Sequence, residues 1–274
     1  SFPPFHTPEF AYAMLIQGIF WAYTRPALKL FAGTLFAAQA VAWTIILGWL
    51  HHVTWGGLLL LGPFVGAWIG TWYLAAWWAM PRMVGRPTFT RLVAMVALAG
   101  AWVLIEWSRT WLLGGFPWLP LSASQWERAS ILQIASFTGA YGVSFVLVAM
   151  NLGFSAMAHS LFIERKSGWN LRRPEFMFGL FLLMGCVSVQ VTEMFRKDSF
   201  KVPLGRVAFV QPYIPQDVKW DASKAQGILD ILAATTLKAG ETRPDLILWP
   251  EASTPFALRG DANAKAFADS LAAR

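Results

Sequence analysis

The sequence predicts two regions: a multi-span α-helical membrane bundle over residues 1–200 and the start of an α/β domain over residues 201–274. Hydrophobic residues make up 56% of the 274 residues and charged residues only 14%, whereas a soluble domain is about one quarter charged. No Asp, Glu, Lys or Arg occurs between Lys29 and Arg82, and a soluble helix pair would need a polar face over such a length. After about residue 200, short apolar runs alternate with an amphipathic stretch, which is typical of α/β domains.

Six apolar segments are candidates for crossing the membrane, a distance that takes about 20 helical residues. The uncharged run after Lys29 is long enough for two helices joined by a turn at 51–54. The first segment, Phe10–Tyr23, is too short to cross without tilting or local thinning of the bilayer. The remaining candidates lie at Leu92–Ile105, within 129–163 and at Phe176–Thr192.

Basic residues gather in alternate connections between these segments. Clusters occur at 25–29, 82–91 and 165–173, whereas the connections at 51–54 and 114–130 carry no net charge. Because Lys and Arg favour the cytoplasmic side of a membrane, we expect residues after about 200 to be extracytoplasmic. Nucleic-acid binding is not expected, since it calls for a basic stripe on a domain without long apolar runs.

Residues 201–274 follow the order strand, helix, strand, helix. The predicted strands are Arg206–Tyr213 and Asp245–Trp249, and the predicted helices are Asp221–Ala239 and Ala262–Ala273. The second strand is almost continuously apolar, which predicts a buried strand. Two strands are too few for a complete core, so we expect the chain to be a fragment that continues into a larger domain. Because it starts at Ser1 without a Met, we also expect its N-terminal start to be missing.

Glu251 is the first candidate for chemistry. It follows Pro250 at the end of the second strand, and sites in parallel sheets lie at the carboxyl ends of the strands. A carboxylate in an apolar setting lined by Trp249 would have a raised pKa and suit a general base. The alternative is an exposed Glu that caps a helix beginning near Ala252.

Several stretches resemble one family. Leu246–Ala252 is similar to the glutamate motif of the nitrilase superfamily, and Val210–Gln216 with 219–221 resembles the start of the nitrilase-like domain of apolipoprotein N-acyltransferases. Four further stretches, in the same order along the chain, resemble the membrane region of that family: Phe2–Phe5, Glu106–Arg109, Gly114–Leu119 and Ser124-Gln125.

The resemblance implies a helical bundle in the bacterial inner membrane, followed by a periplasmic αββα nitrilase-like domain. It implies acyl transfer from a phospholipid to the N-terminal amine of diacylglyceryl-cysteine in a lipoprotein, through a Cys thioester. In the family's Glu–Lys–Cys triad the Glu is the base and the Lys stabilises the oxyanion. The partners so implied are a phospholipid donor, a diacylated lipoprotein acceptor and membrane lipids, with no metal or cofactor.

The resemblance also assigns individual residues. Glu251 matches the triad Glu, and Trp220 matches a Trp important for activity. Arg109 and Trp118 match membrane-region positions suited to phosphate contact and interfacial packing. From the residues alone, Arg109 could equally reach to the surface or pair with Glu106, Trp118 could be an ordinary interfacial aromatic residue, and Trp220 could be a core anchor.

The triad Lys and Cys have no match in residues 1–274. Lys265 lies too close to Glu251, and Cys186, the single cysteine, precedes Glu251 within an apolar run where burial makes a thiol inert. We therefore expect the nucleophile to lie beyond this chain and residues 1–274 alone to be inactive.

Two other functions fit the sequence. One is a membrane-tethered carbon–nitrogen hydrolase, an amidase, which would use Glu251 but not Arg109 or Trp118. The other is a non-catalytic membrane scaffold or transporter. Gly62, Gly66 and Gly70 have the spacing of a helix-packing face within the chain.

Overall fold

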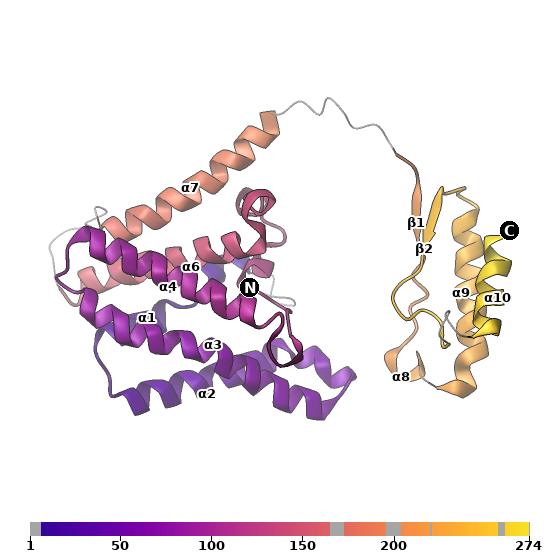
Figure 1. Cartoon of the computed structure of the whole chain (residues 1–274), viewed down its shortest axis with the longest axis horizontal. Helices are drawn as coiled ribbons and strands as arrows, with labels where there is room; N and C mark the ends of the chain where they lie inside the picture. Colours follow the sequence, from indigo (N-terminus) through magenta and orange to yellow (C-terminus); the bar gives the residue numbers. More distant parts are fainter. Residues whose placement is uncertain (1–6, 165–172, 196–203, 220, 257–260, 274) are drawn as a thin grey trace. The chain divides into compact units, whose positions relative to one another are not determined.

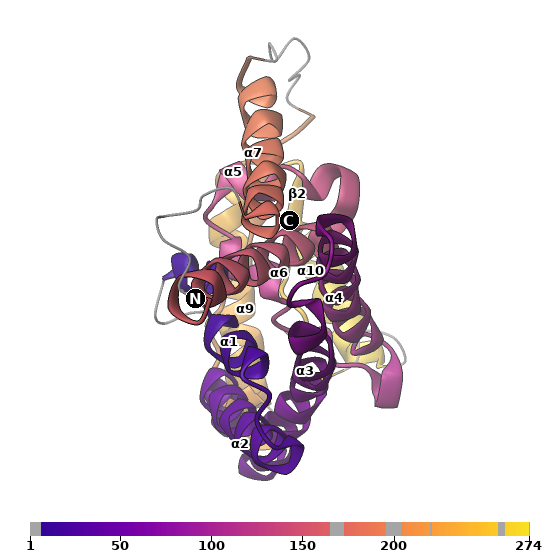
Figure 2. The same ribbon diagram turned by 90° about the vertical axis from the view of Figure 1, so that its left-hand side faces the viewer.

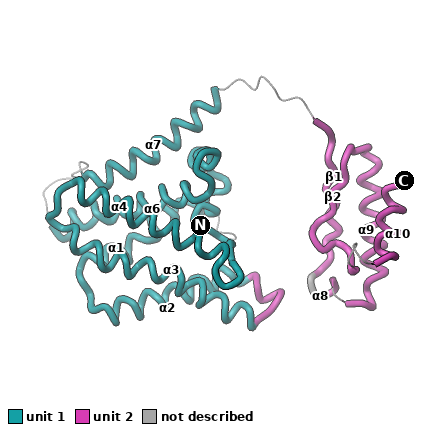
Figure 3. The backbone as a smooth tube through the Cα atoms, viewed as in Figure 1, with its two compact units in different colours: residues 1–48, 56–197 teal, residues 49–55, 198–274 magenta. Residues whose placement is uncertain are grey.

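The computed structural model describes residues 7–164, 173–195, 204–219, 221–256 and 261–273. The chain divides into two units (Figure 1; Figure 3): a helical unit of residues 1–48 and 56–197, and an α/β unit of residues 49–55 and 198–274. Up to residue 195 the elements are 3-10 turns and helices: η1 Pro8–Tyr12, α1 Ile16–Tyr23, α2 Leu28–Ile46, η2 Gly48–His52, α3 Trp55–Met83, α4 Thr88–Ser108, η3 Leu112–Gly114, η4 Leu121–Gln125, α5 Ala129–Leu132, α6 Ala135–Phe162 and α7 Pro174–Phe195.

Five of the described helices, α2, α3, α4, α6 and α7, are long and apolar enough to cross a membrane. The segment Phe10–Tyr23, counted as a sixth candidate, instead forms η1 and the eight-residue helix α1. The break between them is held by Asn151 of α6, whose Oδ1 accepts from the Leu15 amide at 2.9 Å and whose Nδ2 donates to the Ala11 carbonyl at 2.8 Å. These bonds satisfy backbone groups that a helix break would otherwise leave buried and unpaired.

The uncharged run after Lys29 forms the predicted helix pair, α2 and α3. The two backbones approach closely at the small residues of α3. A Cβ atom at Gly66 would lie 2.6 Å from the carbonyl oxygen of Gln39, and one at Gly62 would lie 2.7 Å from the Cα atom of Thr44. The glycine spacing therefore marks a packing face within the chain, as predicted.

Helix α6 lies at the centre of the helical unit, where it packs against α1, α4 and α7 (Figure 2). It has the largest buried share among the five long helices. Its polar residues are bonded inside the unit: Ser144 Oγ accepts from the Ser122 amide at 3.0 Å, and Ser155 Oγ donates to the Asn151 carbonyl at 2.7 Å. A central helix can carry these groups because none of them is left without a partner.

The basic connections meet at one end of the helical unit, here called the basic end. Arg25 between α1 and α2 donates from Nη2 to the Pro81 carbonyl of α3 at 3.2 Å, and Arg91 of α4 pairs with Glu175 of α7 at 3.1 Å. Tyr23 stacks on His159 of α6, with 4.3 Å between ring centroids. Helix α7 begins at this end and its last residues lie at the opposite end (Figure 1).

The α/β unit contains the predicted strand–helix–strand order. Strands β1 Val207–Phe209 and β2 Leu246–Leu248 pair in parallel, with Val207 opposite Leu246. Between them lie α8 Gln216–Lys219, η5 Ala222–Lys224 and α9 Ala225–Gly240, and α10 Ala262–Ala272 follows β2. Helix α9 contacts both strands and α10 contacts α9, so the helices cover one face of the sheet (Figure 1).

The prediction that the second strand is buried is wrong for this structure. In β2, Leu246 is 50% exposed and Leu248 is 39% exposed, with Ile247 between them less so. Phe209, opposite Leu248 in β1, is 78% exposed, because side chains alternate along a strand. On the other face, α9 contributes the buried residues Ile228 and Leu232. In the described part of the α/β unit, the sheet therefore has a helical layer on one side and an open apolar face on the other.

Candidate functional site

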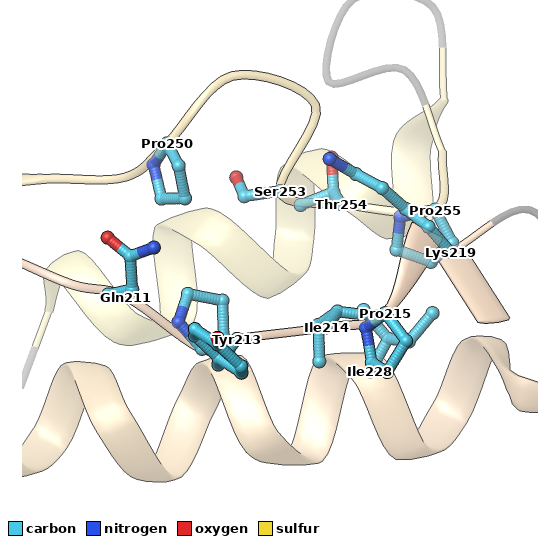
Figure 4. Close-up of a pocket in the computed structure, with 11 residues that line it drawn as sticks. Gln211, Tyr213, Ile214, Pro215, Lys219, Ile228, Pro250, Ser253, Thr254 and Pro255 are labelled. Carbon is cyan, nitrogen blue, oxygen red and sulfur yellow. The ribbon is translucent and has the colours of Figure 1, made fainter. Parts of the chain in front are cut away.

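A cavity of about 420 Å³ lies where β1 and β2 end, the expected place for a site in a parallel sheet (Figure 4). The segment after β1 forms one wall and the segment after β2 forms the opposite wall. Lys219 of α8 and Ile228 of α9 complete the lining. The cavity is mainly apolar, and its polar side chains are Lys219, Gln211, Tyr213, Ser253 and Thr254.

The two walls start from paired strands. The Val210 amide donates to the Leu248 carbonyl at 2.9 Å, which extends the strand pairing by one step. Trp249 turns its indole toward the helices: Nε1 donates to Thr236 Oγ1 of α9 at 3.0 Å, and the ring lies 6.2 Å from that of Phe267 in α10. Trp249 thus anchors the end of β2 to the helical layer rather than lining an apolar niche for Glu251.

Glu251 lies in a turn between Pro250 and Ser253, which line the cavity, but it is not itself a lining residue and its side chain is exposed. Its carbonyl oxygen accepts a hydrogen bond from Lys219 Nζ at 3.3 Å, which links the turn to α8. The next residue, Ala252, has a φ of 48°, a left-handed conformation that costs energy in a residue other than glycine. No helix begins at Ala252, so the capping alternative does not hold, but neither is the carboxylate in the buried setting that was expected.

Trp220 lies outside the described residues. Its neighbour Asp221 caps η5: Oδ1 accepts from the Ser223 amide at 2.9 Å and from Ser223 Oγ at 2.7 Å. These hydrogen bonds to Ser223 lower the pKa of the Asp221 carboxyl below its usual value.

Arg109 caps the C-terminus of α4 and is only 4% exposed. Its guanidinium lies over the ring of Trp43 from α2, with Cζ 5.1 Å from the ring centroid, and Nη2 lies 3.4 Å from the Trp118 carbonyl. Nε and Nη1 are buried without a hydrogen-bond partner among the described residues. Arg109 therefore does not reach to the surface, which removes one of the alternatives.

The second alternative, a pair between Arg109 and Glu106, is also wrong. Glu106 is 3% exposed, and its Oε1 accepts from Trp102 Nε1 at 2.9 Å and from the Leu121 amide at 2.6 Å. Within the described residues, Arg109 has no carboxylate at ion-pair distance. Glu106 instead fixes the start of η4. Its position as the only carboxylate between Glu9 and Glu127 was the signal in the sequence that it has a structural or functional task.

Arg109 also lines a cavity of about 110 Å³ whose other walls are apolar. They come from the first half of α3 and from the segment after α4, and they include Phe64, Trp68 and Phe116. Trp118 is 53% exposed and stacks on Phe116 with 6.3 Å between ring centroids. The arrangement places a cation with free N–H donors inside an apolar recess, which suits the polar group of an amphiphile.

The apolar helices and the buried arginine define the class of protein: a polytopic membrane protein that continues into an α/β unit. The sequence model of the family described as "Apolipoprotein N-acyltransferase N-terminal domain" matches residues 1–153, more than half of the chain. The chain belongs to this family.

Curated relatives named "Apolipoprotein N-acyltransferase" are bacterial. The relative from Brucella melitensis is 28% identical over 93% of this chain and 54% of its own length. The relative from Geobacter metallireducens is 32% identical over 57% of this chain and 29% of its own length. The relative from Shewanella oneidensis is 30% identical over 76% of this chain and 39% of its own length. The chain thus spans about half the length of the Brucella relative, and these matches with the apolar helices indicate a bacterial membrane protein.

Proposed function

We propose that this chain is the amino-terminal part of an enzyme that transfers an acyl chain from a phospholipid to the N-terminal amine of diacylglyceryl-cysteine in lipoproteins. The family match over residues 1–153 carries the proposal. That segment contains Arg109 with two unpartnered buried nitrogen atoms beside an apolar cavity. A membrane bundle of this kind can hold an acyl donor at a fixed place, so that transfer gains from proximity.

The proposed reaction has two steps with a covalent intermediate. In the first, Glu251 accepts the proton of a cysteine thiol, the thiolate attacks the ester carbonyl of the phospholipid, a C–S bond forms and the C–O bond breaks. Glu251 gives this proton to the lysophospholipid oxygen as it leaves, and is a carboxylate again for the second step. In the second, the lipoprotein α-amine attacks the thioester carbonyl, an amide bond forms, the thiolate leaves, and Glu251 takes the amine proton.

We assign the α/β unit to the first part of a nitrilase-like αββα domain. The open sheet face supports this assignment, because apolar residues such as Phe209 and Leu246 require a further layer to be shielded from water. We place the nucleophilic cysteine and the triad lysine in the part of the relatives that this chain does not cover. Cys186 does not fit the role: it is 2% exposed in α7 and its Sγ donates to the Leu182 carbonyl.

We assign Arg109 to the phosphate of the acyl donor and Trp118 to packing at the membrane surface. A guanidinium binds phosphate through charged N–H···O hydrogen bonds, and Nε and Nη1 of Arg109 have no hydrogen-bond partner among the described residues. The basic end then faces the cytoplasm. Because α7 runs away from that end, the α/β unit begins on the periplasmic side in this proposal.

The test uses the full-length protein and a phospholipid with a labelled acyl chain. We expect Glu251→Gln to slow thioester formation by about 10²- to 10⁴-fold, the usual contribution of a general base. Glu241→Gln is the matched control, since Glu241 is an exposed carboxylate at the C-terminus of α9, away from the cavity. Labelling of Glu251→Gln at the wild-type rate would reject the assignment. Hydrolysis of small amides that needs neither lipid nor Arg109 would favour the amidase.

A further inference from the structure

A second cavity, of about 310 Å³, lies at the basic end of the helical unit and takes no part in the proposed acyl transfer. It is lined by Arg25 from the connection between α1 and α2 and by Trp77, Pro81 and Arg82 from the last turns of α3. The cavity of Arg109 lies against the first half of the same helix, near Phe64 and Trp68. The two arginine sites are therefore at different depths along α3.

The walls of this cavity are fixed by hydrogen bonds between segments far apart in the sequence. Arg25 has a φ of 54°, and its Nη2 donates to the Pro81 carbonyl. Trp77 Nε1 donates to the Pro26 carbonyl at 2.9 Å. The Arg82 guanidinium lies 4.7 Å from the ring centroid of Trp78, which restrains its orientation. Both guanidinium groups are thus held at one cavity with further N–H donors unused in the described structure.

The charge of this end is not balanced by the protein. The sequence contains no Asp or Glu between Glu9 and Glu106. At the same end, Arg91 pairs with Glu175 and Arg173 pairs with Glu164, but neither Arg25 nor Arg82 is paired with a carboxylate in the described part of the chain. Two uncompensated cations at one cavity repel each other, so an anion bound between them removes an unfavourable interaction.

We propose that this cavity binds the phosphate of an anionic phospholipid headgroup in the leaflet at the basic end. Guanidinium groups are suited to phosphate oxygens by charge and by the geometry of their donors. Trp77 and Trp78 lie near the C-terminal end of the apolar helix α3. Tryptophan is enriched where membrane helices reach the lipid headgroups. Basic pockets between membrane helices are typical of sites for anionic lipid headgroups, which favours a lipid over a free anion.

The test uses full-length protein in nanodiscs of phosphatidylcholine with increasing phosphatidylglycerol, and counts retained lipids by native mass spectrometry after gentle release. We expect the wild type to retain phosphatidylglycerol, and Arg25→Gln/Arg82→Gln to bind it about 10- to 100-fold more weakly, as the loss of hydrogen bonds between a guanidinium and a phosphate would predict. The matched control is Lys29→Gln/Arg86→Gln, which removes the same charge at the same end from residues that do not line the cavity. Retention in this control should match the wild type.

Three results would overturn the proposal. Equal loss in the two double variants would mean a diffuse attraction to anionic membranes rather than a site. Inorganic phosphate that displaces phosphatidylglycerol from the wild type at low millimolar concentration would identify a site for the free anion. Unchanged retention in Arg82→Gln alone would remove Arg82 from the site. This single variant carries the test if the double variant unfolds in phosphatidylcholine, because the hydrogen bond of Arg82 among the described residues is to the Trp78 carbonyl of its own helix.

Discussion

Arg109 is the main candidate functional residue of the helical unit, and Glu251 is that of the α/β unit. The first is buried and the second is exposed to solvent. Arg109 is 4% exposed and is enclosed by groups from α2 and from the segment after α4. Glu251 is exposed, on a turn that one hydrogen bond from Lys219 links to α8. The helical unit therefore encloses Arg109, whereas the described α/β unit fixes the backbone of Glu251 but leaves its side chain in solvent.

The physical reason for the difference lies in the two solvents. Membrane helices satisfy their backbone polar groups internally and bury the few remaining polar side chains against one another. A two-stranded sheet with helices on one side leaves its other face open, as at Phe209 and Leu246. The described residues bury the candidate of the helical unit, whereas in the α/β unit they leave both this sheet face and the Glu251 side chain exposed.

The largest expected effect tests the enclosed arginine. Arg109→Gln in the full-length protein should raise the phospholipid concentration for half-maximal rate by about 10- to 100-fold, because charged hydrogen bonds contribute about 1.5–3 kcal/mol. Arg128→Gln is the control, since its partner Glu9 is at the surface. If both variants have wild-type kinetics, the burial of Arg109 has no bearing on the donor.

Close packing of the helical unit gives the next effect. Gly66→Ala places a methyl group against the backbone of α2 at Gln39 and should destabilise the protein by about 1–3 kcal/mol. Gly100→Ala in α4 meets nothing within 4 Å and should be neutral or slightly stabilising. Thermal unfolding in detergent measures both. Equal midpoints for the two variants would contradict the proposed α2–α3 face.

A smaller effect is expected in the α/β unit. Thr236→Val keeps the shape of a side chain that is 6% exposed but removes the acceptor of Trp249 Nε1. The free energy of unfolding should fall by about 0.5–1.5 kcal/mol. Faster hydrogen exchange in β2 and α9 would show this loss. Thr235→Val is the adjacent control, because Thr235 is half-buried and its hydrogen bonds in the described structure stay within α9. Exchange that is the same in both variants would show that the Trp249 anchor is not stabilising.

The smallest effect depends on pH. The pKa of Asp221 is lowered by hydrogen bonds from Ser223, so its contribution is present above the ordinary pKa and disappears as the pH falls through the lowered value. Asp221→Asn should therefore unfold at a slightly lower temperature than the wild type at pH 7, and the difference should shrink as the pH falls below the ordinary pKa of Asp and through the lowered one. Asp230→Asn serves as the control, since the Asp230 carboxylate is bonded only by Gln226. A difference that persists at low pH would contradict this account.

Much of the fold was predictable from the sequence. The uncharged run after Lys29 predicted α2 and α3, because only helices can carry so long an apolar stretch through a membrane. The order of strands and helices after residue 200 followed from local patterns and matched the structure. The break at Phe10–Tyr23 was not predictable, since it depends on hydrogen bonds from Asn151, far away in the chain.

The site was predictable in its residues but not in its contacts. The sequence identified Arg109 and Glu106 as polar residues in an apolar setting, but it could not show that Glu106 bonds to Trp102 and Leu121 instead of to Arg109. It placed Glu251 at the end of a strand, but the direction of the Trp249 indole was set by Thr236 in α9. Partners of this kind come from segments that meet only after folding.

Local composition by itself determined which five long helices are apolar enough to cross a membrane and which connections are basic, because transfer of apolar and charged groups between water and lipid acts on each segment separately. Tertiary structure alone decided which polar groups became enclosed, which face of the sheet stayed open, and that Arg25 and Arg82 meet at one cavity. Those outcomes require distant segments to pack together, and no local pattern specifies which segments will do so.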